Sequence, residues 1–255
     1  MKNNKSLGQH WLKNRAILDE IADLAQDGAD AETVCLEIGP GLGTLTSSLL
    51  KRFSKVIAVE FDERLATNLP KSFPNTNLEV IHDDILQVKL SAVLKTDNYV
   101  VVGNIPYYIT SPIIRHLLNA TPSPRRIVLL IQKEVAERIA AEPGSHTFLS
   151  VSVQSRAEGE LGPVVKAAEF TPPPKIDSQV IILTPLQENI LSPEAVKLAK
   201  RGFSSPRKKL IHNLAGYGNT REAWQEILSN NSINLNVRAQ DLELIDWEEL
   251  AKTMK

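Results

Sequence analysis

The sequence contains a single cysteine among its 255 residues, Cys35, which lies in the apolar run Val34-Cys35-Leu36. A disulfide within the chain is therefore excluded, which suits a reducing compartment such as the cytosol. A run of about 18 apolar residues, the length a membrane-spanning helix needs, is also missing. The first residues are polar and lack the apolar core of a signal peptide. We therefore expect a cytoplasmic protein that does not enter a membrane.

Metal ligands and an excess of one charge are lacking too. The histidines show no metal-ligand spacing and have no thiols beside them, so we expect no metal site. A formal net charge of −1 argues neither for nor against a nucleic-acid partner, so the distribution of the cations must decide. With 42% hydrophobic and 23% charged residues, the composition is that of an ordinary globular protein. The length suffices for one large domain, or for one medium and one small domain.

Short apolar runs alternate with helical patterns over the first 141 residues. Strands are predicted at 33–38, 55–60, 78–81, 99–102 and 126–132. Helices are predicted at 14–28, 44–52, 62–69 and 133–141, with another that begins at 110–112, where Ser111 is the candidate cap and Pro112 the first helical residue. This order predicts an α/β fold with a Rossmann-like, doubly wound, mostly parallel sheet, which binds ligands at the carboxyl ends of its strands.

The pattern changes after Gly144. Strands are predicted at 161–170 and 179–183, on either side of three consecutive prolines, 172–174, which cannot lie in a central strand and would hold Phe170 in place. Helices are predicted at 193–202, 206–215, 220–230 and 238–253. We therefore expect a first domain at 1–184, with residues 1–28 packing over its ligand site, and a small all-α domain at 185–255.

A glycine-rich turn follows the first of these strands. The stretch Glu37-Ile38-Gly39-Pro40-Gly41-Leu42-Gly43 gives G-x-G-x-G preceded by an acid, whereas a dinucleotide fingerprint has its third glycine one position later. This pattern is typical of S-adenosylmethionine-dependent methyltransferases. Glu60 ends the second strand, where a carboxylate can accept hydrogen bonds from ribose hydroxyls. Asp84 follows the third strand, where it can accept from an adenine amino group, and Ile85 can pack on that ring.

The fourth strand ends in Asn104-Ile105-Pro106-Tyr107. Asn104 offers a carbonyl oxygen, Pro106 biases Ile105 toward an extended conformation that aims its carbonyl, and Tyr107 offers a ring for stacking. Two acceptors beside a ring suit an exocyclic amine such as N6 of adenine. Taken alone, the tetrapeptide favours a simple strand-to-helix turn with a packed tyrosine, and only the rest of the chain favours the amine-binding interpretation.

Six cations cluster between Ala195 and Arg221, a stretch without an acidic residue. A solvated helix face is the alternative, but this density favours contact with RNA phosphates. Lys2, Lys5 and Lys13 would extend the cluster. The six candidate RNA-binding residues are Lys197, Lys200, Arg201, Arg207, Lys208 and Lys209.

Taken together and in order, these segments resemble the ribosomal RNA adenine N6-dimethyltransferases of the KsgA type. The resemblance covers nearly the whole chain, from Lys5-Ser6-Leu7-Gly8-Gln9-His10-Trp11-Leu12 to the segment that starts at Phe170 and ends at Ser178. It implies a class I methyltransferase fold, S-adenosylmethionine as cofactor, and dimethylation of two adjacent adenosines in the hairpin near the 3′ end of 16S ribosomal RNA, on an immature 30S subunit. It also implies a role in ribosome biogenesis, and we expect a monomer.

The resemblance assigns roles to individual residues. Tyr107 and Phe170 would sandwich the target adenine, beside Asn104, Ile105 and Pro106. His10 stands where the family often has Asn, and Tyr108 also occupies a position that is often Asn. The family's cofactor contacts correspond here to His10, Leu12, Gly39, Glu60, Asp84 and Asn104, to which the turn and strand pattern adds Gly41 and Ile85.

Three other functions compete. The large-subunit ribosomal RNA adenine methyltransferases that confer macrolide resistance share the Asn104 motif, although Ser111-Pro112 and residues 202–210 look more like the small-subunit enzyme. A methyltransferase fold can also serve as a binding or assembly factor, but Glu60, Asp84 and Asn104 are intact. An NAD-dependent dehydrogenase is disfavoured by the displaced third glycine.

Overall fold

The computed structural model describes residues 10–254, which divide into two compact units. Of the described residues, the first unit comprises 10–136 and 159–185, and the second comprises 137–158 and 186–254. Residues 137–158, which the sequence analysis assigned to the first domain, thus group with the C-terminal helices. Lys2 and Lys5 lie outside the described residues. Within residues 10–254, no helix is both long and apolar enough to cross a bilayer.

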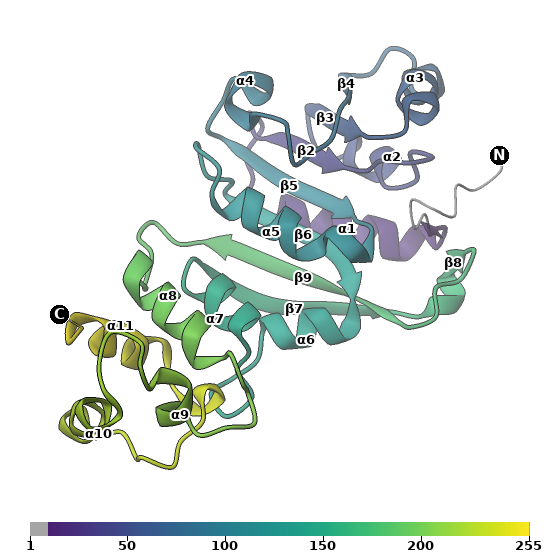
Figure 1. Cartoon of the computed structure of the whole chain (residues 1–255). Coiled ribbons are helices and arrows are strands. Elements are labelled where there is room, and N and C mark those ends of the chain that lie inside the picture. Colours follow the sequence, from purple (N-terminus) through teal and green to yellow (C-terminus); the bar gives the residue numbers. More distant parts are fainter. Residues whose placement is uncertain (1–9, 255) are drawn as a thin grey trace. The chain divides into compact units, whose positions relative to one another are not determined.

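The first unit is built on one mixed sheet, shown in Figure 1, with the order β4-β3-β2-β5-β6-β9-β7. Five strands run parallel to one another: β4 (Leu78–His82), β3 (Lys55–Glu60), β2 (Val34–Ile38), β5 (Tyr99–Asn104) and β6 (Arg126–Gln132). β9 (Ser178–Pro185) runs antiparallel to β6, and β7 (Ala157–Val165) forms the edge. The predicted fold class is confirmed.

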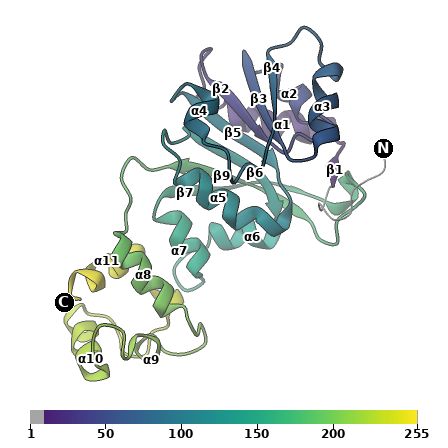
Figure 2. The ribbon, with the colours of Figure 1, turned by 45° about the horizontal axis from the view of Figure 1, so that its top comes forward.

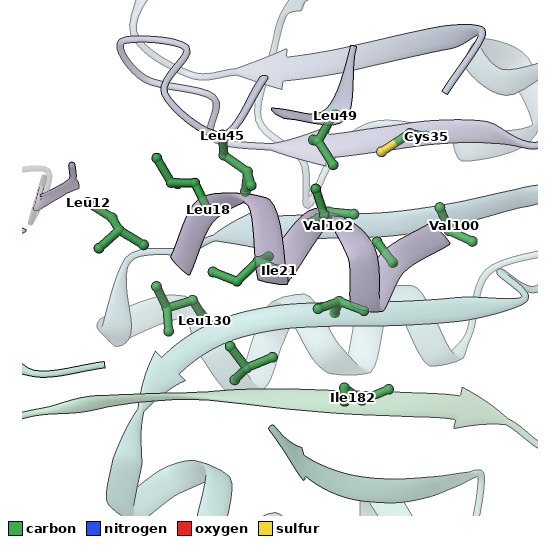
Figure 3. Close-up of a cluster of buried hydrophobic side chains, with 14 of the residues drawn as sticks. Leu12, Leu18, Ile21, Cys35, Leu45, Leu49, Val100, Val102, Leu130 and Ile182 are labelled. Carbon is green, nitrogen blue, oxygen red and sulfur yellow. The ribbon is translucent and has the colours of Figure 1, made fainter. Parts of the chain in front are cut away.

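Helices α1 (Arg15–Gln26) and α2 (Thr46–Leu49) cover one face of this sheet (Figure 3). The side chain of Asn14 caps α1 by accepting from the backbone N–H groups of Ala16 and Ile17. The buried side of α1, with Leu18 and Ile21, packs on every second residue of the central strands because alternate strand residues face opposite sides. This packing fixes the segment that precedes α1.

The opposite face carries α5 (Thr110–Leu118), as Figures 1 and 2 show. The prediction that Ser111 caps this helix is wrong. A 3-10 turn, η2 (Tyr107–Ile109), runs directly into α5, and the Thr110 hydroxyl donates to the Tyr107 carbonyl oxygen at 3.1 Å. The helix therefore starts before Ser111.

Two further helices complete the first unit around its sheet. α3 (Glu63–Ser72) is capped by Asp62, which accepts from the N–H groups of Arg64 and Leu65. It continues through Pro70 to Ser72 instead of ending before the proline. The short α4 (Leu90–Leu94) precedes β5 and was not predicted.

The predicted strand 161–170 is wrong in its second half. β7 ends at Val165, a 3-10 turn η3 (Ala167–Glu169) follows, and β8 (Phe170–Thr171) pairs with β1 (Trp11–Leu12) in a separate two-stranded sheet. The chain turns here because the carboxylate of Asp177 accepts from the Ala167 N–H at 3.0 Å and from Lys166 Nζ at 2.8 Å. The small sheet holds the N-terminal segment beside β5.

The second unit is helical and packs around two fully buried tryptophans, Trp224 and Trp247. Its elements are α7 (Phe148–Gln154), α8 (Pro193–Gly202), α9 (Leu210–Leu214), α10 (Arg221–Asn230), η4 (Ala239–Asp241) and α11 (Leu244–Lys252), while α6 (Lys133–Ile139) spans the division. The predicted helix 206–215 is too long. Asn213 donates to the carbonyl oxygens of Gly202 and Ser205, so residues 203–209 wrap around it as a turn.

Candidate active site

A cavity of about 250 Å³ lies in the first unit, at the carboxyl ends of β2, β3 and β5. It is lined by His10 and Trp11, by the glycine-rich turn, by the segments after β3 and β4, and by residues 104–109 after β5. Parallel strands present their carboxyl ends at one edge of the sheet, which brings these distant segments together. Asn104, Glu60 and Asp84 thus line the same cavity, as the strand pattern predicted.

The glycine-rich turn needs its glycines for two separate reasons. Gly41 and Gly43 adopt φ values of +59° and +80°, which other residues rarely adopt. At Gly43, a Cβ atom would lie 2.7 Å from side-chain carbons of Leu69 and Phe73, so α3 could not pack there. At Gly41, a Cβ atom would lie 3.2 Å from the Trp11 indole nitrogen, at the wall of the cavity.

Glu60 ties β3 to the glycine-rich turn. It is 6% exposed, and its carboxylate accepts from the backbone N–H of Gly41 at 3.0 Å and from that of Asp62 at 2.8 Å. Burial raises the pKa of Glu60, and these two hydrogen bonds partly offset that rise. Each carboxylate oxygen keeps a second lone pair, which can still accept from a ligand hydroxyl.

Glu37 is a second buried acid in the cavity wall, and the sequence analysis gave it no role beyond its place before the glycines. It is 1% exposed, and its Oε2 atom has no hydrogen-bond partner among the described residues. The pKa of Glu37 is raised to about 8, and burial is the main cause. Hydrogen bonding with Thr46 partly offsets this rise, and the nearby charge of Glu60 adds to it. An acid inside an apolar strand was the signal that could have revealed it.

Asp84 and Ile85 lie at the end of the cavity formed by the segment after β4. The Asp84 carboxylate accepts from the Leu86 N–H at 3.0 Å, which bends the chain there. Ile85 is 5% exposed and contributes an apolar wall beside the carboxylate. A carboxylate next to an apolar surface is suited to a flat ring that carries an amino group.

The Asn104 side chain is held in one orientation. Its Nδ2 atom donates to the backbone oxygen of His10 at 3.0 Å, and only the NH₂ end of an amide can donate to a carbonyl. The Oδ1 atom is therefore left as an acceptor at the cavity. This contact joins residues 94 positions apart and was not visible in the sequence.

The Tyr107 ring is fixed at both ends. Its hydroxyl shares a 2.8 Å hydrogen bond with the hydroxyl of the fully buried Ser178, and Pro106 precedes it with φ −60° and ψ 134°. Burial raises the pKa of Tyr107, partly offset by the Ser178 contact. The ring stacks against His10, with 6.1 Å between ring centroids and 19° between the planes.

Two predicted site residues do not line the cavity. Phe170 is 3% exposed and Leu12 is 1% exposed, and both belong to the hydrophobic cluster under α1. Leu12 of β1 lies opposite Phe170 of β8, and this pairing directs both side chains into the cluster. The structure therefore brings Asn104, Ile105, Pro106 and Tyr107 together but leaves Phe170 outside that group.

The predicted RNA-binding cations all lie in the second unit and are exposed. Lys197, Lys200 and Arg201 lie on α8, and residues 207–209 lie in the turn before α9 instead of opening that helix. Within residues 10–254, none of the six forms an ion pair; Lys209 donates to the side-chain oxygen of Asn236.

The sheet, the glycine-rich turn, Glu60 at the end of β3 and Asp84 after β4 define an S-adenosylmethionine-dependent methyltransferase. A family profile described as "Ribosomal RNA adenine dimethylase" matches residues 1–254. The chain belongs to the ribosomal RNA adenine dimethylase family and is a ribosomal RNA adenine dimethyltransferase.

Curated relatives match over nearly the full length. "Ribosomal RNA small subunit methyltransferase A" of Nostoc punctiforme is 41% identical over 270 residues, which cover 98% of this chain and 94% of the relative. The protein of the same name from Dehalococcoides mccartyi strain CBDB1 is 38% identical over 257 residues, covering 98% and 88%.

Two solved structures are similar over most of both chains. A dimethyladenosine transferase from Plasmodium falciparum has a TM-score of 0.80 at 28% identity, covering 94% of this chain and 96% of that one. The 23S rRNA methyltransferase ErmE has a TM-score of 0.75 at 25% identity, covering 96% and 99%.

Proposed function

We propose that this protein dimethylates N6 of two adjacent adenosines in the 3′-terminal hairpin of small-subunit ribosomal RNA, and so acts in small-subunit maturation in the cytoplasm. The observation that carries the proposal is the Asn104 amide, which the His10 carbonyl holds with Oδ1 free beside the fixed Tyr107 ring. The names of the curated relatives support the small-subunit substrate.

The charge of the cavity wall suits the cofactor. Besides Glu37, whose raised pKa of about 8 keeps it protonated at neutral pH, three acids line it, Glu60, Asp83 and Asp84, and the described lining residues include neither Lys nor Arg. A pyrophosphate would be repelled there, whereas S-adenosylmethionine carries positive sulfonium and ammonium groups and supplies an activated methyl group when bound. The residues thus fit this cofactor.

The chain offers a partner for each part of the cofactor. Glu60 would accept from the ribose hydroxyls and Asp84 from the adenine amino group, with Ile85 against the ring. The backbone of Gly39 and Gly41 permits close approach. The remaining contacts would come from His10, Leu12 and Asn104, with Leu12 acting through its backbone because its side chain is buried elsewhere.

The target amine would be gripped by two acceptors, Asn104 Oδ1 and the Ile105 carbonyl oxygen. The lone pair of an adenine amine is delocalised into the ring and is a poor nucleophile. Acceptors on its two N–H bonds favour the pyramidal amine that develops during attack, so they stabilise the transition state more than the ground state. Positioning would supply most of the acceleration.

Contact with the RNA backbone is assigned to the exposed cations of α8 and of residues 207–209. Such contacts position the enzyme but do not choose the base. They release counterions, so RNA binding would weaken as salt rises. The base would be chosen by RNA shape and by the cavity.

Mass spectrometry of reacted ribosomal subunits tests the proposal. Unmethylated small and large subunits would be incubated separately with the enzyme and isotopically labelled S-adenosylmethionine, and the RNA fragments sequenced. We expect two neighbouring dimethyladenosines near the 3′ end of the small-subunit RNA. Labelling only of large-subunit RNA, the substrate named for ErmE, would establish the alternative function. Absence of labelling in both would favour a binding or assembly factor.

A further inference from the structure

The hydroxyl group of Tyr107 reaches a buried part of the sheet. It shares a hydrogen bond of 2.8 Å with the hydroxyl of Ser178, which is 0% exposed. Tyr107 begins the turn η2 after β5, whereas Ser178 is the first residue of β9. Because β6 lies between β5 and β9 in the sheet, the Tyr107 side chain extends across the carboxyl end of β6. The ring that lines the cavity is thus joined to a strand outside the cavity lining.

Ser178 is itself fixed by the sheet. It lies opposite Gln132, the last residue of β6, in the antiparallel pairing of β6 with β9. The backbone oxygen of the preceding residue, Asp177, accepts from the Lys133 N–H at 3.1 Å. The Asp177 carboxylate accepts from the turn before β8, at residues 166 and 167. The Ser178 hydroxyl is therefore an anchor whose position is set by the strands and not by the cavity.

Two contacts restrain the Tyr107 ring in complementary ways. The hydroxyl oxygen of a tyrosine lies on the axis about which its ring rotates. The Ser178 hydrogen bond therefore fixes the direction of this axis but leaves rotation about it free, and that torsion has a broad energy minimum. Stacking on the His10 imidazole, with 19° between the two planes, restrains the rotation. Loss of the Ser178 contact would let the axis swing.

The Tyr107 hydroxyl is not suited to proton transfer. Burial raises the pKa of Tyr107 above its ordinary value, and the Ser178 contact offsets only part of that rise. The hydroxyl therefore stays protonated at neutral pH, so it is not available as a general base for the proton that the methylated amine must lose. Its effect on the reaction has to come from the position of the ring.

We propose that Ser178 is a positioning residue for methyl transfer, because its hydroxyl holds the Tyr107 ring in the orientation in which the target adenine stacks on it. The amine of that adenine would be held at Asn104, three residues before the ring. A ring that swings would tilt the base and misalign its amine with the activated methyl group, and such misplacements slow reactions. This inference rests on the proposed function for the role of Tyr107, and it assigns a task to a residue that does not line the cavity.

A double-mutant cycle tests the link. The variants are Ser178→Ala, Tyr107→Phe and the combination of the two, each of which removes the same hydrogen bond. Single-turnover methylation of unmethylated small subunits, at saturating enzyme and cofactor, gives the rate of transfer. Filter binding gives RNA affinity, calorimetry with S-adenosylhomocysteine gives cofactor affinity, and melting temperatures report the stability of each variant.

The first unit supplies a matched control for each substitution. Ser48 is also 0% exposed, and its hydroxyl donates to the Asp19 carboxylate at 2.7 Å. Tyr99 is 0% exposed as well, and its hydroxyl donates to the Pro122 carbonyl oxygen at 2.7 Å. Neither Ser48 nor Tyr99 lines the cavity. Ser48→Ala and Tyr99→Phe therefore remove buried hydrogen bonds of the same kind away from the site.

We expect Ser178→Ala and Tyr107→Phe each to slow methyl transfer by roughly 3- to 30-fold, between the worth of one hydrogen bond and the cost of a misplaced reacting group. The double variant should be no slower than the slower single variant, because both changes break one interaction. RNA and cofactor affinities should stay nearly constant. The two controls should keep the wild-type rate even where their melting temperatures fall.

Several results would overturn the proposal. A wild-type rate in Ser178→Ala would show that the serine only stabilises the fold. A loss confined to Tyr107→Phe would assign a direct role to the tyrosine hydroxyl, and losses that multiply in the double variant would show that the two residues act independently. If Ser178→Ala does not fold, Tyr107→Phe decides alone, and a wild-type rate in that variant overturns the proposal.

The same experiment keeps the proposed function separate. If the wild-type enzyme labels only large subunits, the proposed function fails, and the cycle is then measured on that RNA. Coupled losses there would still support the positioning role of Ser178, and independent losses would refute it.

Discussion

Replacing Glu37 with Gln should change how the stability of the first unit depends on pH. Folding raises the pKa of the buried Glu37 carboxyl from 4.5 to about 8. Between these two pH values the carboxyl is protonated in the folded protein and ionised in the unfolded chain. The stability contribution of the neutral acid is therefore complete below pH 4.5 and is lost as pH rises toward 8. Gln keeps the shape and cannot ionise, so it should remove this dependence.

The magnitude follows from the size of the shift. Each pH unit between the two pKa values costs about 1.4 kcal/mol of folding free energy, so wild type and Glu37→Gln should diverge by about 3 to 4 kcal/mol between pH 5 and pH 8. Comparing the two proteins at each pH cancels the titrating groups that do not interact with Glu37. Any fixed cost of the substitution shifts the difference equally at all pH values.

Urea unfolding, followed by circular dichroism at intervals from pH 5 to 8.5, measures this divergence. Glu20→Gln on the exposed side of α1 is the matched control and should run parallel to the wild type. A Glu37→Gln difference that stays constant across the range would refute the reasoning, because it would mean that Glu37 ionises equally in both states.

Three other changes test different parts of the chain. Asn104→Ala should slow methyl transfer by roughly 100-fold or more, because the substitution removes a contact that strengthens in the transition state. RNA affinity in a filter-binding assay should stay nearly unchanged. Full activity of this variant would contradict the role assigned to Asn104. Replacing the cations at 207–209 with Gln should weaken RNA binding and reduce the slope of log affinity against log salt by about 2. An unchanged slope would place the RNA elsewhere. Gly202→Ala should destabilise the second unit by about 1 to 3 kcal/mol in urea titrations, because the new methyl group would overlap the Trp247 ring. A neutral result would show that Trp247 can move.

The sheet was predictable where local signals and tertiary packing agree. The bounds of β3 and β6 match the apolar runs residue for residue because both strands are buried on two faces. α8 matches as well, since Ser192 caps it and Pro193 occupies its first position. The short elements β1 and β8 were missed because each has two residues and exists only through the other.

The sequence predicted which residues form the candidate site, but it did not predict the hydrogen bonds between them. The carboxyl ends of parallel strands must meet, so Glu60, Asp84 and Asn104 could be grouped without coordinates. The hydrogen bond from Asn104 to the His10 backbone and the one between Tyr107 and Ser178 join residues 94 and 71 positions apart, and no local pattern specifies either.

The net charge of −1 is the sum over two regions of opposite charge, the acidic cavity wall and the basic surface of the second unit. The cavity wall carries the acids Glu60, Asp83 and Asp84 beside the protonated Glu37, which suits a cationic cofactor and disfavours a phosphate group there. The exposed cations of α8 and residues 207–209 suit phosphates instead. Because surface charges are screened by salt much more than buried ones, salt should act chiefly on RNA binding and pH chiefly on the cavity. Changes of salt and changes of pH should therefore separate a residue that acts in the cavity, such as Glu37, from a cation that contacts the RNA backbone.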